Sequence, residues 1–183
     1  MPKRNASVFV AIDFETADYG QDSACAVGLV RVERGVITAR EYRMIRPPRD
    51  SFVFTYIHGI TWADVANEPE FGEVWQACAS IFDGAGFIAA HNASFDANVL
   101  AACCDRAGLP RTKLPFVCTV KLARIQWKIF PTKLPDVCRK LNISLNHHEA
   151  LSDAEACARI VIAAMNDTVL PSEQNTPVSP PVP

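Results

Sequence analysis

The sequence contains no apolar run long enough to span a membrane and no excess of charge of one sign. No stretch reaches the ~18 apolar residues of a membrane span. The basic start runs into apolar residues, but Asp13 ends that run after about six of them, whereas a signal peptide needs roughly 7–15. The net charge of -2 gives no overall basic character that would indicate a nucleic-acid partner. We therefore expect a cytoplasmic protein that does not contact a membrane.

The cysteines lack the pattern of a disulfide framework or a zinc site. There are 7 of them, an odd number, and no Cys-x-x-Cys pair occurs. Most lie beside alanine or valine in apolar helical stretches. We interpret them as reduced core residues, which agrees with a cytoplasmic chain.

Length and composition are those of a single globular domain. The chain has 183 residues, of which 49% are hydrophobic and 21% charged, enough for one real core. We expect an N-terminal arm at residues 1–7, a folded domain at 8–165 and a disordered tail at 166–183. The tail is rich in proline, serine and threonine and shows no periodicity.

Apolar periodicity and turn residues divide the folded domain into strands and helices. The strand-like stretches are 7–15, 23–33, 36–45, 86–91 and the start of 116–130. Helices are expected at 62–67 after Thr61, at 69–82 from Pro69, at 92–108 with Ser94 as the cap, from Thr119 as far as Pro131, and at 133–142 and 149–165. The segment 46–61 is expected to be a loop. Strands that form a meander and then alternate with helices predict an α/β fold, with a mixed sheet covered by helices on both faces.

The first strand ends in two acidic residues. In VFVAIDFET, Asp13 and Glu15 share one face of the strand, and Phe14 takes the other. Two neighbouring carboxylates repel each other and lose solvation at a strand end, and a bound cation would neutralise them. Taken alone, the pair fits equally well a strand that has ended in solvent.

Further acids follow later elements. Asp96 lies in the first turns of a helix that leaves a buried strand, and Asp153 lies near the start of the last helix, five residues after His148. Alone, Asp96 is typical of an acid favoured by the helix dipole, and Asp153 of a solvated helical residue. If these acids converge where the first and fourth strands are adjacent, they form a four-carboxylate pocket. Such a pocket suits two divalent cations, Mg²⁺ or Mn²⁺, which clamp the attacking and leaving oxygens of a phosphodiester displacement.

Three motifs carry a family resemblance. The stretches DFET, HNASFD and HHEALSDA, in this order, resemble the motifs of the DEDDh 3′-to-5′ exonuclease superfamily. That group includes the proofreading epsilon subunit of bacterial DNA polymerase III, RNase T and oligoribonuclease. The resemblance extends roughly from Val8 to Met165, and IHGIT at 57–61 also resembles the epsilon-like branch. It implies an RNase H-like fold with a five-stranded mixed sheet.

The resemblance also implies roles for individual residues. It implies metal ligation by Asp13, Glu15, Asp96 and Asp153, with His148 as general base. His147 is the alternative base, but only His148 has the five-residue offset to the last aspartate. Glu149 stands where a sister group has tyrosine, which disfavours that branch.

Other matching positions lie near the terminal nucleotide in relatives. They are Thr16, His58, His91 and Asn92. For His58, satisfying loop backbone is the alternative interpretation. The chain departs from the common family pattern at residues 17–20 and 25–28, near the expected nucleotide site, and this leaves the base and sugar preference open.

The segment 111–140 is the most basic part of the chain. It holds eight lysines and arginines and one acid, Asp136, with Trp127 and Phe130 between them. These residues could hold a nucleic-acid backbone through its phosphates, or they could be the solvated faces of two helices.

We expect a metal-dependent exonuclease that releases nucleoside 5′-monophosphates from a free 3′ end, with single-stranded DNA favoured over RNA. The alternatives are an RNA exonuclease of the RNase T or oligoribonuclease kind, and a non-catalytic adaptor that binds 3′ ends for a polymerase or repair complex. Proofreading, repair and RNA turnover use the same active site, so the pathway stays open. A polymerase or repair partner and a homodimer stay open too.

Overall fold

The computed structural model describes residues 8–167. The predicted arm at 1–7 and most of the predicted tail, 168–183, lie outside the described residues. The prediction for the start of the tail was wrong, because Asn166 and Asp167 continue the last helix. No helix within residues 8–167 is long and apolar enough to cross a membrane.

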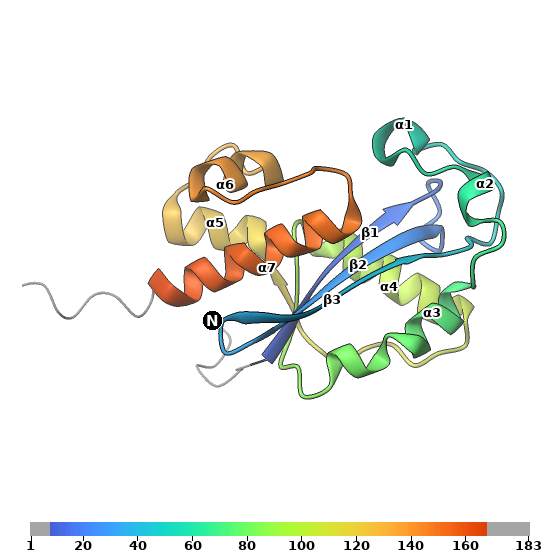
Figure 1. Ribbon diagram of the computed structural model, residues 1–183, viewed down its shortest axis with the longest axis horizontal. Coiled ribbons are helices and arrows are strands. Elements are labelled where there is room, and N and C mark those ends of the chain that lie inside the picture. The colour runs from blue at the N-terminus through green and yellow to red at the C-terminus, as the bar shows by residue number, and fades with distance from the viewer. Residues whose placement is uncertain (1–7, 168–183) are drawn as a thin grey trace, which may run out of the picture.

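The sheet has five strands in the order β3-β2-β1-β4-β5 (Figure 1). Their bounds are β1 Val8–Thr16, β2 Ala24–Glu33, β3 Val36–Met44, β4 Ile88–Ala90 and β5 Phe116–Cys118. β1, β2 and β3 form an antiparallel meander with a turn at Arg34 and Gly35, whereas β4 and β5 run parallel to β1. The predicted mixed sheet and its strands are confirmed.

Seven α-helices and one 3-10 helix connect and cover the strands in the described part of the chain. They are α1 Thr55–His58, α2 Trp62–Val65, α3 Phe71–Ala77, η1 Ala79–Phe82, α4 Ser94–Arg106, α5 Thr119–Trp127, α6 Leu134–Leu141 and α7 Ala150–Asp167. Thr61 caps α2 as predicted, in a reciprocal pair with Asp64.

Some predicted helix details were wrong. The segment 46–61 is not all loop, because one helical turn, α1, forms in it and ends at Gly59 in the left-handed conformation. The helix expected at 69–82 is two pieces, α3 and η1, separated at Cys78. Ser94 is the first residue of α4 rather than its cap, which is Ala93. α5 ends before Pro131, since Lys128 takes a left-handed conformation.

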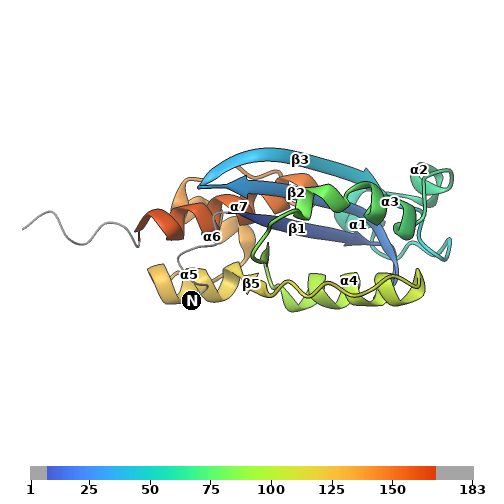
Figure 2. The same cartoon turned by 90° about the horizontal axis from the view of Figure 1, so that it is seen from below.

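The two faces of β1 support two separate cores. Val10, Ile12 and Phe14 pack with α3 and α4. Phe9 and Ala11 point to the other face and pack with α5, α6 and α7. Figure 2 shows α3 in front of the strands and α7 behind them. Asp13 and Glu15 continue the second series, because side chains alternate along a strand. The strand therefore directs both acids toward the α7 side of the sheet.

All seven cysteines are free and six are buried, as predicted.

The start of α7 lies directly on the sheet at Gly28, which pairs with Asp13 across β1 and β2. A Cβ atom at Gly28 would stand 2.2 Å from the carbonyl oxygen of Ala150. This approach is closer than any side chain permits. It brings the first turn of α7, and with it Asp153, next to the acids of β1.

We predict that Gly28→Ala destabilises the protein by about 1–3 kcal/mol, because the added methyl overpacks backbone that cannot rotate away. Chemical denaturation measures the change. Gly72→Ala is the matched control. Gly72 lies inside helix α3, where alanine is more favourable than glycine by roughly 0.5–1 kcal/mol. A Cβ atom at Gly72 would meet only the methyl of Ala107, at 3.4 Å. Equal stability of Gly28→Ala and the native chain would contradict the prediction.

Candidate active site

The site lies where β1 extends past its neighbour β4. The two strands pair only at Val10 with Ile88 and at Ala11 with Ala89, and β4 ends at Ala90. The rest of β1 has no strand on that side. Ligands of α/β proteins bind in such crevices, at the carboxyl ends of parallel strands.

Asp96 fills the space that β4 leaves open. The backbone N–H of Phe14 donates to its Oδ1 at 3.1 Å, in place of a ladder bond to a strand. Asp96 stands in the first turn of α4 and is 1% exposed. A single carboxylate thus joins β1 to α4 and is itself fixed by the sheet.

The predicted acids come together. Asp13, Glu15, Asp96 and Asp153 interact electrostatically, although they come from β1, α4 and α7. Burial, and then the charges of neighbouring carboxylates, raise the pKa of Asp13 well above its usual value. The same causes raise the pKa of Glu15 to about 8. Burial raises the pKa of Asp96 to about 7 and also raises the pKa of Asp153. The pocket therefore penalises negative charge and calls for a cation.

Asp153 has one bonded oxygen and one free oxygen. The Nδ1–H of His147 donates to Oδ2 at 2.9 Å, and the backbone N–H of His148 donates to the same oxygen at 3.2 Å. Oδ1 is buried and has no hydrogen-bond partner among the described residues. A buried carboxylate oxygen without a partner is costly unless a ligand binds it. The orphaned oxygen and the carboxylate chemistry of the four acids suit a hard divalent cation, although within residues 8–167 no three of these acids bring their ligand atoms within 4.8 Å of one another.

His147 and His148 stack on each other, with ring centroids 3.8 Å apart. His148 has a left-handed backbone, with φ at 69°. The Nδ1 atom of His147 forms a hydrogen bond with Asp153. Within residues 8–167, no protein group forms a hydrogen bond with the ring of His148. Burial and the neighbouring His147 lower the pKa of His148, which keeps its imidazole neutral and able to accept a proton.

Within residues 8–167, the metal-binding side chains whose ligand atoms gather within 4.8 Å are those of His147, His148 and Asp153. Sequence reasoning treated His147 only as an alternative base and missed its bond to Asp153. The residue that follows His147 has a left-handed backbone, and residue spacing shows neither that conformation nor the bond.

His58 braces the loop after β1. The backbone N–H of Ile60 donates to its Nδ1 at 3.1 Å, so the proton is on Nε2, which donates to the carbonyl oxygen of Thr16 at 3.1 Å. Both ring nitrogens are used by backbone, which agrees with the alternative interpretation for this residue. Thr16 itself is buried beside the acids at the end of β1.

His91 joins the end of β4 to the connection between α5 and α6. Its Nε2–H donates to the carbonyl oxygen of Thr132 at 2.9 Å, and its Nδ1 lies 2.8 Å from the hydroxyl of Thr119. Protein groups therefore occupy both nitrogens. Asn92, the next residue, is exposed and takes a left-handed conformation with φ at 63°. Of the four expected nucleotide contacts, Asn92 is the one whose side chain faces solvent.

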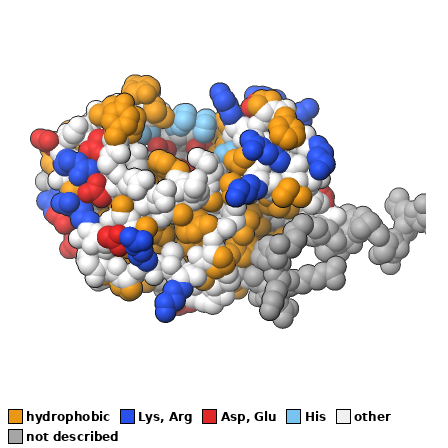
Figure 3. All heavy atoms as spheres, turned by 180° about the vertical axis from the view of Figure 1, so that it is seen from behind, with side chains coloured by type: hydrophobic (Ala, Val, Ile, Leu, Met, Phe, Trp, Pro, Cys, Tyr) orange, Lys and Arg blue, Asp and Glu red, His pale blue; other side chains and the backbone are white. Residues whose placement is uncertain are grey.

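The basic segment forms one rim of the site. Figure 3 shows histidines in a hollow of the surface, with acidic side chains behind them and basic side chains over α5 and α6. The exposed cations of that rim include Lys121, Arg124, Lys128 and Lys133. Other members of the segment are ion-paired, such as Arg111 with Asp105. Only part of the predicted basic stretch is thus available to phosphates.

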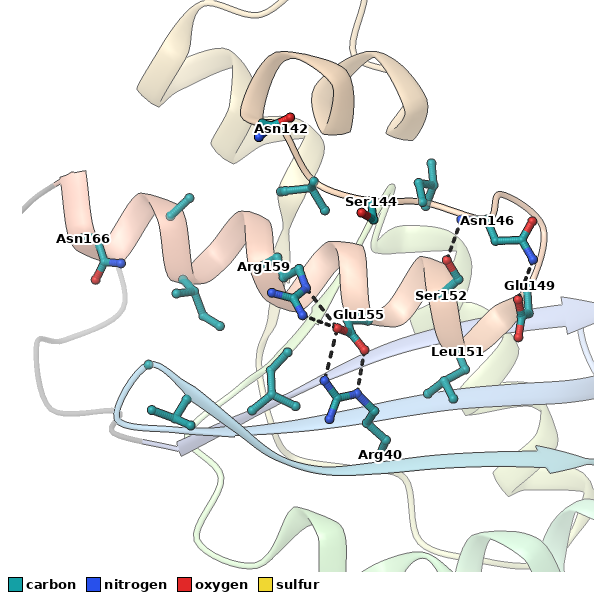
Figure 4. Close-up of a pocket in the computed structure, with 17 residues that line it drawn as sticks. Arg40, Asn142, Ser144, Asn146, Glu149, Leu151, Ser152, Glu155, Arg159 and Asn166 are labelled. Atoms are coloured by element: carbon teal, nitrogen blue, oxygen red, sulfur yellow. Dashed lines mark hydrogen bonds and ion pairs between the residues drawn. The ribbon is translucent and has the colours of Figure 1, made fainter.

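A large groove lies outside the carboxylate pocket (Figure 4). It has a volume of about 1100 Å³ and runs between β3, α7 and the loop that precedes α7. Glu155 accepts hydrogen bonds from Arg40 and Arg159 in this groove. None of the four catalytic-type acids lines it, so its size does not mark the chemistry.

A mixed sheet of this order, with four interacting carboxylates contributed by β1, α4 and α7 and a histidine near Asp153, is the arrangement that the three sequence motifs imply. The chain belongs to the exonuclease family named after RNase T, whose model matches residues 10–161. The resemblance drawn from the three motifs is confirmed.

Curated relatives include both long and short proteins. The chain is 30% identical over 169 residues to a PolC-type DNA polymerase III of Bacillus cereus, covering 88% of this chain but only 12% of that protein. It is 33% identical over 170 residues to exodeoxyribonuclease 10 of Escherichia coli, covering 89% of this chain and 71% of that protein.

Solved structures of exonucleases have folds similar to that of this chain. An exonuclease X in complex with 5′ overhanging duplex DNA has a TM-score of 0.70 at 28% identity, covering 91% of this chain and 96% of that one. The nuclease domain of 3′hExo, a DEDDh family member bound to rAMP, has a TM-score of 0.76 at 18% identity, covering 90% and 94%. The second likeness supports the RNase H-like fold alone.

We predict that the metal-free protein loses stability as the pH rises from about 6.5 to about 8, above the range in which the lowered pKa values of His58, His91 and His148 act in the opposite direction. Glu15 and Asp96 keep their protons to higher pH when folded, because their pKa values rise from 4.5 to about 8 and from 3.8 to about 7. The folded chain therefore binds more protons than the unfolded chain in this interval, and the free energy of unfolding falls.

Denaturation in a chelator at about pH 6.5 and about pH 8 measures this, and Mg²⁺ or Mn²⁺ should reverse the loss. Glu155, whose pKa its arginine partners lower to about 2, acts below this interval. Stability that rises from about pH 6.5 to about pH 8 in the chelator would contradict the prediction.

We predict that Asp96→Asn stabilises the metal-free protein at pH 8 by about 0.5–2 kcal/mol. The amide oxygen can still accept from Phe14, while one negative charge leaves the cluster. Asp96→Ala is the control, because it removes the charge and also leaves the buried N–H of Phe14 unpaired, which costs about 1–3 kcal/mol. Thermal unfolding of the three proteins decides, and a less stable Asp96→Asn would show that repulsion is not the dominant effect.

Proposed function

We propose that this protein is a divalent-cation-dependent 3′-to-5′ exonuclease that releases nucleoside 5′-monophosphates from single-stranded DNA. One observation carries the proposal. Four carboxylates from three elements converge in a pocket that raises their pKa values, and one of their buried oxygens has no partner. A non-catalytic adaptor would gain nothing from keeping this costly arrangement together with an available histidine.

Asp13, Glu15, Asp96 and Asp153 are the residues that would hold Mg²⁺ or Mn²⁺. When bound there, two divalent cations would balance the carboxylate charge and supply an electrostatic clamp on the attacking and leaving oxygens. The protein's part is to hold the oxygens rigidly. β1 is fixed between two cores, Asp96 by Phe14, and Asp153 by His147 and the backbone of His148.

His148 is the proposed general base. Its neutral ring can accept the proton of the attacking water, and one of its ring nitrogens lies within 4.8 Å of a carboxylate oxygen of Asp153. His147 is a positioning residue in this scheme, because its proton is already shared with Asp153. His58 and His91 position the two loops that flank the site, and Thr16 and Asn92 border the space for the terminal nucleotide.

Two comparisons support DNA as the substrate. One is named exodeoxyribonuclease 10, and the chain covers 71% of it. The other is the exonuclease X that was solved with duplex DNA carrying a 5′ overhang. The lysines and arginine over α5 and α6 would hold phosphates by charge, without reading sequence.

The experiment compares DNA and RNA strands of one sequence, each labelled at the 5′ end, with Mg²⁺ or Mn²⁺. We expect the label to remain on products that shorten from the 3′ end, faster for DNA, and Asp13→Ala to abolish the reaction. An intact labelled DNA strand would contradict the exonuclease proposal. Faster degradation of RNA would overturn only the proposed preference for DNA. A protein contact to the 2′-hydroxyl would then explain the preference for RNA.

We predict that His148→Ala lowers kcat by about 10²–10⁴-fold at saturating metal, the usual contribution of a general base. His147→Ala is the matched control. It loses the bond to Asp153, so it should need more Mn²⁺ but recover most of its rate when the metal is saturating. Single-turnover rates over a Mn²⁺ titration separate the two effects. The reverse pattern would make His147 the base.

A further inference from the structure

The loop that carries the proposed base is exposed where the base stands. Residues 142–149 join α6 to α7, and Ile143 and Leu145 pack on the core shared by α5, α6 and α7. Residues 146–149 are all exposed. Apolar packing therefore holds the beginning of this loop, and polar bonds have to hold the turn that contains His148.

The turn is also strained. The backbone φ of His148 is 69°, in the left-handed region that residues with a side chain adopt at a cost in free energy. Such a conformation persists only where the surrounding structure determines it. One support is the backbone N–H of His148, which donates to Oδ2 of Asp153 at 3.2 Å. This distance is at the long end of the usual range, so we looked for further bonds across the turn.

Three residues around the two histidines supply such bonds. The backbone N–H of Asn146 donates to the hydroxyl oxygen of Ser152 at 2.8 Å, and its side-chain N–H donates to Oε2 of Glu149 at 2.7 Å. Figure 4 shows both bonds beside the first turn of α7. The backbone N–H of Asp153 donates to the carbonyl oxygen of Glu149 at 3.0 Å. We call Asn146, Glu149 and Ser152 the loop clamp.

The loop clamp encloses the turn from both ends. Asn146 precedes the two histidines and Glu149 follows them, so their side-chain bond spans the turn. Ser152 ties the same turn to α7, the helix that also carries Asp153. A single exposed hydrogen bond stabilises little, but bonds that share a residue and enclose a short turn support one another. The loop clamp therefore restricts where the ring of His148 can lie.

The position of that ring decides whether it can act as the base. One of the ring nitrogens of His148 lies within 4.8 Å of a carboxylate oxygen of Asp153. A general base has to lie within about 2.6–3.2 Å of the group whose proton it takes. A misplacement of about 1 Å can lower a rate by about 10²-fold. Loosening the turn would thus affect the rate much more than the stability of the whole protein.

We propose that Asn146, Glu149 and Ser152 are positioning residues that hold His148 in place for its role as general base. The inference rests on the proposed function, since it concerns the base of that reaction. The loop clamp works through His148. It therefore changes kcat, and leaves KM for the nucleic acid and the metal requirement as they are.

The test uses the full-length protein with paired variants. Ser152→Ala removes one acceptor, whereas Ser152→Thr keeps a hydroxyl. Glu149→Ala removes the other acceptor, whereas Glu149→Gln keeps an oxygen that can accept from Asn146 but lacks the charge. Ser144→Ala is the matched control, since Ser144 is exposed on the same loop and takes no part in these bonds.

At saturating Mn²⁺ we expect Ser152→Ala and Glu149→Ala to lower kcat on single-stranded DNA by about 5- to 50-fold, less than the loss of the base itself. KM and the Mn²⁺ concentration at half-maximal rate should stay within about twofold of the native values. Ser152→Thr, Glu149→Gln and Ser144→Ala should keep the native kcat within about twofold. A change in KM or in the metal requirement with native kcat would overturn the proposal, because the residues would then serve binding.

A His148→Ala background tests whether the effect passes through the base. If it does, adding Ser152→Ala to His148→Ala lowers the single-turnover rate no further, because the ring to be positioned has gone. A general loosening of the structure would lower the rate by the same factor in both backgrounds, and this result would overturn the proposal.

Hydrogen exchange separates this inference from the proposed function. In the metal-free protein, the His148 amide should exchange about 10-fold faster in Ser152→Ala and in Glu149→Ala, although neither variant removes its acceptor on Asp153. That result without any hydrolysis by the native chain would refute the exonuclease and leave a clamp that orders His148 standing. Hydrolysis by the native chain, with the same exchange rate and the same kcat in all variants, would refute the loop clamp and leave the exonuclease standing.

Discussion

The structure depends on keeping carboxylates close together that repel one another. Asp13 and Glu15 on β1, Asp96 on α4 and Asp153 on α7 interact in a pocket that water reaches poorly. Left to themselves, such groups would move apart or keep their protons. The fold keeps the carboxylates from moving apart, because it holds them on rigid elements. β1 is held between two apolar cores, and α7 comes so near the sheet that only a glycine fits at residue 28.

Those supports belong to the global fold, and this explains how a small domain tolerates the strain. The acids stand at the ends of elements whose other residues are apolar and buried, so the energy that opposes the cluster is met by packing elsewhere. The clustered carboxylates therefore destabilise the protein locally, and the packing of the surrounding strands and helices offsets this destabilisation. Proteins often become more stable when such a group is removed, at the expense of activity.

The sequence allowed the sheet and the acidic pocket to be predicted, because both follow from local patterns. A period of two along residues 7–15 determines which acids share a face, and the three motifs supply the partners. The sequence did not show what depends on backbone conformation or on distant contacts. His148 takes a left-handed conformation, His147 bonds Asp153, and the carbonyl oxygen of Thr132 accepts a hydrogen bond from His91. The single helical turn α1 was not predicted, because its four residues are too few to show a helical periodicity. Ser94 was assigned as a cap from its residue type, yet the helix begins one residue earlier than a serine cap would require.

The bond between Phe14 and Asp96 has one more consequence. It replaces a strand-to-strand bond with one to an ionisable group, so an amide of the sheet is exposed to the electrical state of the pocket. Any ligand that draws electron density from the carboxylate will weaken its hold on that amide proton. The nuclear resonance of a single main-chain amide in the core is therefore a built-in gauge of charge at the reaction centre, readable without a substrate and without a label at the site.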